Sequence, residues 1–220
     1  NGTTKSIQTT CKGHPFRADR CGKNFARKQP ANRPGTHREG NHIRVYAQND
    51  GSLGCSIGWG WDRERNTYAS NNTVANNLVR NFKLQEQVAS LGDGGGIYML
   101  GPQQNSTVTA NWVSRMGAGR GGGAFYPDEG SAFWDMGHNV FSNASFCRDD
   151  CQFLHIWTAS IHNITTHDTF TDTETQDVKG TNTPVVNTTI VPKGTPIDKW
   201  PASAQLIMQN AGPLPGSLDW

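Results

Sequence analysis

The residues Ser106-Thr107-Val108-Thr109-Ala110-Asn111-Trp112-Val113 show a pattern that recurs along this chain. A short stretch of β-branched residues is followed by a polar turn marked by asparagine, and then by a second short apolar stretch. The same pattern occurs at residues 72–79, 131–140 and 162–170. The intervals between these segments are roughly 30 residues, a period that is typical of solenoids and propellers.

The length of the repeat decides between these two architectures. A propeller blade needs about four strands in 40 or more residues, whereas two or three strands and a turn match one coil of a parallel β-helix. Asparagine suits the turn because it tolerates the left-handed conformation. We therefore predict an all-β fold, a right-handed parallel β-helix (solenoid), with an irregular N-terminal extension and a short C-terminal helix. The predicted strands, stacked in register, lie at about 74–79, 107–113, 132–141 and 161–170, and the helix lies near 202–209.

Length and composition place the chain among globular proteins. It has 220 residues, which is enough for one domain of ordinary size. Its 7 Trp, 9 Phe and 4 Tyr exclude disorder of the whole chain. No run of about 18 apolar residues occurs, so we expect no membrane span.

The net charge of +2 conceals a division along the chain. Residues 1–40 hold nine Lys or Arg against two acids, while residues 41–220 carry more acids than bases. We predict that residues 1–40 form a basic, disulfide-pinned extension or cap, and that residues 41–220 hold the β-helix coils and a C-terminal exit segment. The basic head contains no basic helix or pattern of stacking aromatics, so we expect no nucleic acid partner.

Two further features indicate an oxidising, secretory environment. Acceptors of the form Asn-x-Ser/Thr are frequent, and we expect at least two of them to carry glycans. These acceptors are Asn1, Asn71, Asn105, Asn143, Asn163 and Asn187. The spacings of Cys11 with Cys21 and of Cys147 with Cys151 suit local disulfides. Cys55 is left over, either as a buried free thiol or as a partner of a further segment or chain.

Several blocks of the sequence resemble a known group of proteins. They are Gly58-Trp59-Gly60-Trp61, Asp93-Gly94-Gly95-Gly96-Ile97-Tyr98, Leu100-Gly101-Pro102-Gln103, Asp128-Glu129-Gly130-Ser131, and the closing Trp200-Pro201-Ala202 with Ala204-Gln205 and Asn210-Ala211-Gly212. In this order the blocks resemble secreted right-handed parallel β-helix proteins of carbohydrate-active type, such as glycoside hydrolases and polysaccharide lyases. The resemblance covers roughly residues 45–215, the C-terminal half of a typical member. It implies the fold more specifically than the reaction, because this fold also serves non-catalytic proteins.

Three carboxyl groups carry the predicted chemistry. Asp93 and Asp128 each border a Gly-rich turn, and we expect them on the same face of consecutive coils. Coils stack about 4.8 Å apart, so the two carboxyls would lie roughly 5–10 Å apart, the range that glycosidic hydrolysis uses. Glu129 adds a third carboxylate whose repulsion could raise the pKa of its neighbour, as a general acid requires. The alternative is that these acids are turn residues only.

Aromatic residues are candidates for sugar binding, because pyranose faces present C–H groups to aromatic planes. We predict substrate contacts from Trp59, Trp61 and Tyr98, with burial as the alternative. The resemblance adds His155, because related sequences place a His-rich segment there. No cofactor or metal is expected. The Gly-x-Gly-x-x-Gly at 117–122 precedes a strand rather than a helix, and the acidic stretch 168–177 lacks the glycine of a calcium loop and suits a solvated outer strand.

Two classes of function remain open. The first is a secreted carbohydrate-active enzyme that hydrolyses a polysaccharide with paired carboxylates, with a polysaccharide lyase as the less favoured form. The second is a non-catalytic extracellular structural glycoprotein, such as a strut, a lectin-like surface or a filament subunit. Expected partners are a polysaccharide or glycan, and further polypeptide of the same protein or identical subunits at the open N-terminal edge. We favour the first class and a secreted, extracellular location.

Overall fold

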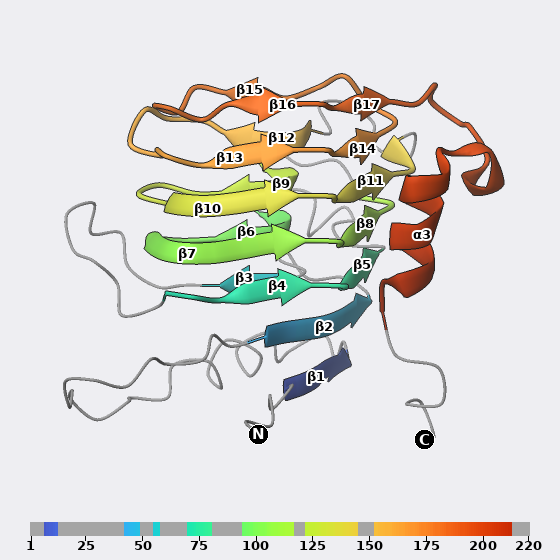
Figure 1. The fold of residues 1–220 in the computed structure, drawn as a ribbon, viewed down its shortest axis with the longest axis horizontal. Coiled ribbons are helices and arrows are strands. Elements are labelled where there is room, and N and C mark those ends of the chain that lie inside the picture. The colour runs from blue at the N-terminus through green and yellow to red at the C-terminus, as the bar shows by residue number, and fades with distance from the viewer. Residues whose placement is uncertain are drawn as a thin grey trace.

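The computed structural model describes residues 70–80, 94–116, 122–144 and 152–212, together with strands at 7–12, 42–48 and 55–57. In chain order the elements are β1 (Ile7–Lys12), β2 (His42–Gln48), β3 (Cys55–Ile57), β4 (Thr73–Ala75), β5 (Leu78–Arg80), β6 (Gly95–Met99), β7 (Pro102–Thr109), β8 (Trp112–Ser114), β9 (Gly123–Pro127), β10 (Ala132–Gly137), β11 (Val140–Ser142), β12 (Gln152–Ile156), β13 (Thr165–His167), β14 (Phe170–Thr171), β15 (Asp177–Val178), β16 (Val185–Val186), β17 (Thr189–Ile190), the 3-10 helix η2 (Ile197–Lys199) and α3 (Ala202–Asn210). Figure 1 shows the short strands stacked in layers along one axis.

The strands form two sheets in which every described pair is parallel. The larger sheet has the order β16-β13-β10-β7-β4-β2-β5-β8-β11-β14-β17, with β1 added on β2. The smaller sheet has the order β15-β12-β9-β6-β3. From β4 onward each strand pairs with the third strand after it, because the chain returns to the same face once per coil. These stacked parallel sheets are consistent with the predicted β-helix.

Each segment predicted as one strand is two strands separated by a corner. The segment 74–79 forms β4 and β5, and the segment 107–113 forms the end of β7 and then β8. The segments 132–141 and 161–170 divide in the same way. The reason is one residue per coil with positive φ, which leaves the extended region and turns the chain. These residues, which we call the mid-sheet corner, are Asn76, Ala110, His138, Asp168 and Asn187, with φ between 50° and 56°.

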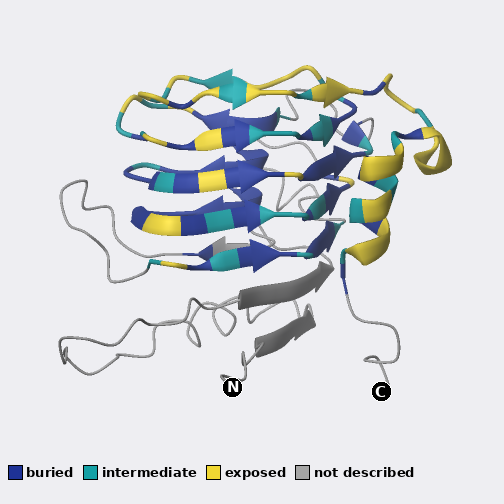
Figure 2. Ribbon diagram, in the orientation of Figure 1, coloured by how far each residue is buried: buried dark blue, intermediate teal, exposed yellow. Residues whose placement is uncertain are grey.

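Apolar ladders fill the interior of the coils. Val74 of β4 lies in register with Val108 of β7, which lies in register with Met136 of β10. Val79 and Val113 pair in the same way on β5 and β8. All five are buried, and Figure 2 shows burial throughout the middle coils and exposure in the last coil, β15–β17. In-register stacking therefore removes a continuous apolar row from water for each strand position.

The C-terminal helix occupies the predicted position. α3 buries Ala204 and Met208 on one side and exposes the remaining residues of its surface to varying degrees. Figure 1 shows α3 beside β5, β8 and β11, at one side of the stack. The apolar cluster formed there consists of Val140, Val191, Trp200, Ala204 and Met208.

The region predicted as an irregular extension contains one strand. β1 pairs in parallel with β2 over six residues, and it covers an edge that β2 would otherwise leave unpaired. In the described part of the chain, no helix is long and apolar enough to cross a membrane.

Candidate functional site

A row of polar and aromatic side chains follows the smaller sheet. Tyr98 of β6 lies opposite Tyr126 of β9, and His155 of β12 lies opposite Asp177 of β15. The rings of Tyr98 and Tyr126 meet edge to face with centroids 5.2 Å apart, and the rings of Tyr126 and His155 do so at 4.8 Å. Four successive coils therefore contribute one residue each to a single row, which we call the aromatic ladder.

Asp128 follows β9 directly, beside this ladder, and is only 3% exposed. Its carboxylate accepts hydrogen bonds from the Tyr98 hydroxyl, from Tyr126 Oη at 3.1 Å and from Trp157 Nε1 at 2.9 Å. The backbone N–H of Glu129 donates a fourth bond at 2.7 Å. Four donors therefore converge on the Asp128 carboxylate.

Neighbouring polar groups orient His155. Its Nδ1 lies 2.5 Å from Gln152 Oε1 and 3.7 Å from Asp177 Oδ2. Both oxygens are acceptors, so Nδ1 is the ring nitrogen that carries a hydrogen, and this N–H donates a hydrogen bond to Gln152 Oε1. Trp157, just after β12, is 39% exposed although its Nε1 is bonded to a buried carboxylate. An indole ring that reaches solvent therefore contacts the carboxylate beside the ladder.

The structure brings together four residues that were predicted from the sequence. Tyr98 and His155 belong to the aromatic ladder, and Asp128 and Glu129 lie beside it. Residues 128–131 also form a turn, in which Gly130 has a φ of 78° and Ser131 N donates to Asp128 O at 2.9 Å. Asp128 and Glu129 are therefore turn residues, and the turn places the Asp128 carboxylate against the ladder, while their part in catalysis stays a prediction.

Other predicted positions lie outside the described residues, and their roles stay predictions. They are Asp93, Trp59, Trp61, Asn1, Cys21, Cys147 and Cys151. For Cys11 in β1 and Cys55 in β3 the structure describes the strand and not the side chain. The residues after the Gly-x-Gly-x-x-Gly sequence form the strand β9 and not a helix, as predicted.

The predicted glycosylation acceptors share one backbone feature. All five within the described residues have positive φ, and all but Asn105, which lies within β7, stand between strands: Asn71, Asn105, Asn143, Asn163 and Asn187. Four of them are exposed, whereas Asn143 is half-buried and its Nδ2 donates to Ser114 Oγ at 2.8 Å. For Asn71, Asn163 and Asn187 the threonine two residues later lies in the next strand, whereas Asn105 and Thr107 both lie in β7. The acceptor pattern therefore follows from coil geometry, whether or not glycans are attached.

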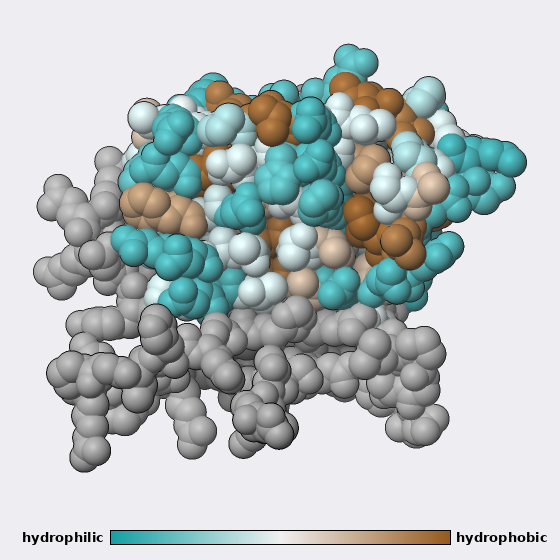
Figure 3. Space-filling view, viewed as in Figure 1, coloured by the Kyte–Doolittle hydropathy of each residue, from teal (hydrophilic) through white to brown (hydrophobic). Residues whose placement is uncertain are grey.

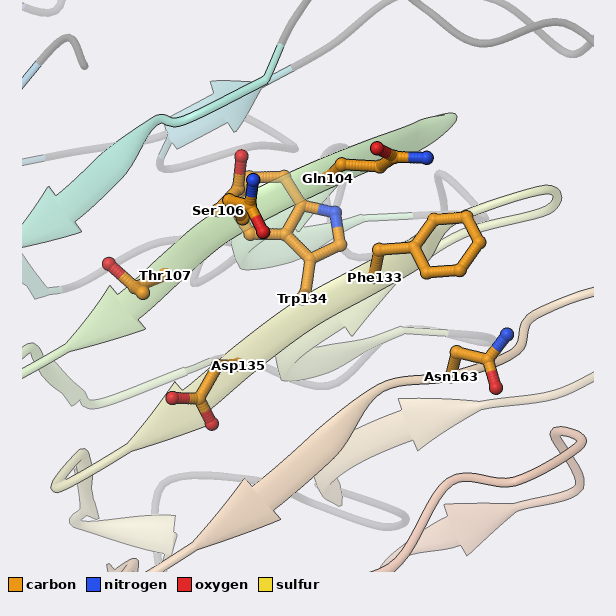
Figure 4. Close-up of a pocket in the computed structure, with 8 residues that line it drawn as sticks. Gln104, Ser106, Thr107, Phe133, Trp134, Asp135 and Asn163 are labelled. Atoms are coloured by element: carbon orange, nitrogen blue, oxygen red, sulfur yellow. The ribbon is translucent and has the colours of Figure 1, made fainter. Parts of the chain in front are cut away.

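A pocket of about 690 Å³ opens on the outer face of the larger sheet, between β7 and β10 (Figure 4). Its lining consists of Gln104, Asn105, Ser106, Thr107, Phe133, Trp134, Asp135 and Asn163. The pocket forms where the register between the two strands shifts at Phe133, which has a φ of 65°. A bulge of this kind re-aims a side chain, and the Phe133 ring stands edge-on to His162 with centroids 5.4 Å apart.

The surroundings of the pocket are polar. Figure 3 shows mainly hydrophilic and neutral residues over β7, β10 and β13. Amide groups, one carboxylate and aromatic rings can orient a polar ligand by hydrogen bonds and by stacking. The sequence did not point to this pocket, because its residues belong to three coils, and the register between β7 and β10 shifts locally.

A second group that the sequence did not reveal lies further along the same face. His167 Nδ1 is 2.8 Å from Asp168 Oδ2, and His167 Nε2 is 3.0 Å from Asp135 Oδ1. The pKa of His167 is raised, chiefly because of the hydrogen bond to Asp168, with Asp135 adding to the effect and burial opposing it. His138 completes the group, with its ring edge-on to His167 at 5.4 Å. The group depends on the register that places Asp135–Gly137 of β10 beside Thr165–His167 of β13, which the sequence alone does not reveal.

The acidic stretch 168–177 was predicted to form a solvated outer strand. The structure contradicts this prediction in part. Glu174 is exposed and Asp177 is half-buried in β15. Asp172, however, is 5% exposed, and its carboxylate accepts the backbone N–H groups of Asn143 at 2.9 Å and Ala144 at 3.1 Å. Burial raises the pKa of Asp172, while these hydrogen bonds act to lower it. The prediction is wrong for Asp172 because its carboxylate binds the backbone of the preceding coil.

Comparison with protein-family models, with curated proteins and with solved structures found no match to this chain. The mostly β, all-parallel architecture therefore stands on the structure of the chain itself. Carbohydrate-active and secreted character, which the resemblance implied, remains a prediction.

Proposed function

We propose that this protein is a secreted right-handed parallel β-helix protein that binds a polysaccharide and hydrolyses its glycosidic bonds. The stacked parallel sheets support the handedness, because crossovers between parallel strands of one sheet are right-handed in about 98% of cases. The carboxylate beside the aromatic ladder supports the chemistry. Exposed asparagines in glycosylation acceptors support passage through a secretory compartment.

The observation that carries the proposal is the contact between Asp128 and Trp157. Trp157 Nε1 donates to Asp128 Oδ1 at 2.9 Å, while 39% of Trp157 is exposed. An exposed indole offers a sugar ring an apolar plane, and the bond to Asp128 restrains the orientation of that plane. Glycosidic hydrolysis needs a carboxylate at a fixed place beside the bound ring, and this contact supplies both groups.

Asp128 suits the role of the ionised carboxylate in a hydrolytic pair. Two tyrosine hydroxyls and an indole N–H hold it between three coils. In such a pair the ionised group attacks the sugar or activates a water, and the other carboxyl protonates the leaving oxygen. Glu129, which is half-buried and follows Asp128 in the turn, and Asp93 are the candidates for this second carboxyl.

Glycan binding without hydrolysis is a second candidate function. The observation in its favour is that four hydrogen bonds already occupy the Asp128 carboxylate, so a substrate would have to displace one of the donors. The pocket between β7 and β10 is open instead. Its Phe133 ring and the amides of Asn105 and Asn163 provide stacking and hydrogen bonds of the kind that sugars use.

Hydrolysis and binding of a panel of neutral and acidic polysaccharides separate the two functions. We expect Asp128→Asn to lower the release of reducing ends by at least about 10²-fold, as loss of an essential carboxylate does. Trp157→Ala should raise KM more than it lowers kcat, because stacking contributes similarly to the ground state and the transition state. Glu174→Gln is the matched control, since Glu174 is an exposed acid outside the ladder, and it should leave turnover unchanged.

Circular dichroism and thermal midpoints of each variant separate loss of fold from loss of chemistry. Wild-type turnover in a folded Asp128→Asn variant contradicts hydrolysis at Asp128. If the protein binds polysaccharide without cleaving it, and Phe133→Ala abolishes this binding, the function is glycan binding and not hydrolysis.

A further inference from the structure

Three side chains from two successive coils converge on the outer face of the larger sheet. His138 and Asp168 both stand at the mid-sheet corner, and His167 is the residue before Asp168. One donor atom from each of the three lies within 4.8 Å of the other two. Successive coils stack about 4.8 Å apart, so the backbone itself holds the two corner residues at this separation.

Asp135 orients His167 from the side opposite Asp168. His167 Nε2 lies 3.0 Å from Asp135 Oδ1, so this nitrogen donates to a carboxylate. Gly137 leaves space for the ring, because a Cβ there would lie 2.3 Å from His167 Cε1. A histidine that donates one ring N–H to a carboxylate presents its other nitrogen as a metal ligand, and this is the usual arrangement behind histidine ligands.

The two oxygens of Asp168 have different neighbours. Oδ1 accepts a hydrogen bond from Asn187 Nδ2 at 3.3 Å, whereas Oδ2 faces His167 Nδ1 at 2.8 Å. His138 is exposed, so its side chain can rotate toward this pair. One carboxylate oxygen and two imidazoles are thereby directed to a common point.

We propose that His138, His167 and Asp168 bind one divalent transition-metal ion, best matched by Zn²⁺, and that Asp135 is a positioning residue for His167. Two imidazoles and a carboxylate form a donor set that Zn²⁺ prefers. Tetrahedral bonds of about 2.0–2.2 Å place ligand atoms about 3.3 Å apart. Rotation of the His138 side chain and small adjustments of His167 and Asp168 bring the three donor atoms, now within 4.8 Å of one another, to this separation. The ion takes the place of the proton between His167 Nδ1 and Asp168 Oδ2, and a fourth position is left for water.

The chain itself suggests substitutions that keep the fold. Ala110 holds the mid-sheet corner one coil before His138 with nearly the same φ, so His138→Ala suits that backbone. Thr109 lies in register with His167, two coils earlier in the same sheet. Threonine therefore suits this backbone, and we choose His167→Thr. Asparagine holds the corner in the coil after Asp168, which recommends Asp168→Asn.

Zn²⁺ binding to the full chain, stripped beforehand with a chelator, is measured by calorimetry, and Co²⁺ binding by visible absorption. We expect one site of about micromolar Kd or tighter in the wild type that each of the three ligand variants loses. Asp135→Asn should weaken this site about 10–100-fold without removing it, as loss of a group behind a histidine ligand does. His162→Ala is the matched control, because His162 lies on the same face but bonds to Asn163, and it should bind as the wild type does.

The comparison between variants decides the outcome, since histidine and cysteine are general Zn²⁺ ligands and the chain contains others outside this group. Equal binding by the wild type and by folded His138→Ala and His167→Thr variants overturns the proposal, and the cluster is then an ion-pair network alone. A loss in His162→Ala as large as in the ligand variants also overturns it.

Discussion

Asn111 joins three successive coils through one buried side chain. Its Oδ1 accepts the backbone N–H of Asn77 at 3.0 Å and the Asn77 amide at 2.7 Å. Its Nδ2 donates to Val74 O at 2.9 Å and to Asn139 Oδ1 at 3.0 Å. Buried amides persist where their polar atoms are paired, which explains why asparagine follows the corner in three coils in a row.

Replacing this amide should therefore be costly. Asn111→Ala removes four buried hydrogen bonds, two with Asn77, one with Val74 O and one with Asn139 Oδ1. We expect the free energy of unfolding to fall by about 3 kcal/mol or more, because each hydrogen bond contributes about 0.5–1.5 kcal/mol. Urea unfolding followed by circular dichroism measures the change.

Gln104→Ala is the control for Asn111→Ala, because it removes an exposed amide from the strand of the same coil. It should change the free energy of unfolding by no more than about 0.5 kcal/mol. If the two variants lose similar stability, the asparagine stack does not support the coils.

Among the elements, β6 approaches β8 and β9 closely at Gly96. A Cβ there would lie 2.6 Å from Val113 Cγ1 and 2.8 Å from Ala124 O. Contacts under about 3 Å force neighbouring groups to move, and a close-packed interior yields only at a cost. The absence of a side chain at Gly96 thus sets how near these strands can lie.

Gly96→Ala tests this packing at the level of the strands. We expect a loss of about 1–3 kcal/mol in the free energy of unfolding, as for other overpacked interiors. Adding Val113→Ala removes both Cγ atoms from the contact, so the double variant should lose less than the sum of the two single variants. Strictly additive losses in a double-mutant cycle of urea unfolding would show that the two side chains do not compete for space.

On the scale of the molecule, corner asparagines run along the length of the stack. Asn71 and Asn163 stand before β4 and β13, Asn105 has positive φ within β7, and Asn187 stands at the mid-sheet corner of the last coil. Their side chains are exposed. A glycan attached there leaves the surface without entering the core, so the fold accommodates several glycans at once.

Expression through a eukaryotic secretory pathway tests the secreted assignment. We expect at least two of these four exposed asparagines to carry glycans, and treatment with an amide-cleaving deglycosidase to lower the intact mass. Occupancy at Asn143 should be lowest, because its amide is half-buried and bonded to Ser114. An intact mass that the deglycosidase leaves unchanged removes the support that the acceptors lend to secretion.

The sequence by itself determined the parallel coil and part of the candidate site. Asparagine in left-handed corners and β-branched residues in short strands follow local conformational preferences. They can therefore be predicted without knowledge of long-range contacts. For the same reason the helix near 202–209 was predicted correctly. Tyr98, Asp128 and Glu129 were found because they lie in or beside turns with recognisable composition.

Tertiary structure alone decided which residues of different coils meet. Hydrogen-bonded asparagines on neighbouring coils lie at different separations along the chain. The separation is 34 residues for Asn77 and Asn111, 28 for Asn111 and Asn139, and 19 for Asn163 and Asn182. Because the coils differ in length, spacing along the chain does not reveal their register. A shift of one residue would turn every strand side chain to the opposite face. The convergence of His138 with His167 and the burial of Asp172 depend on that register, so neither could be derived before the coils were stacked.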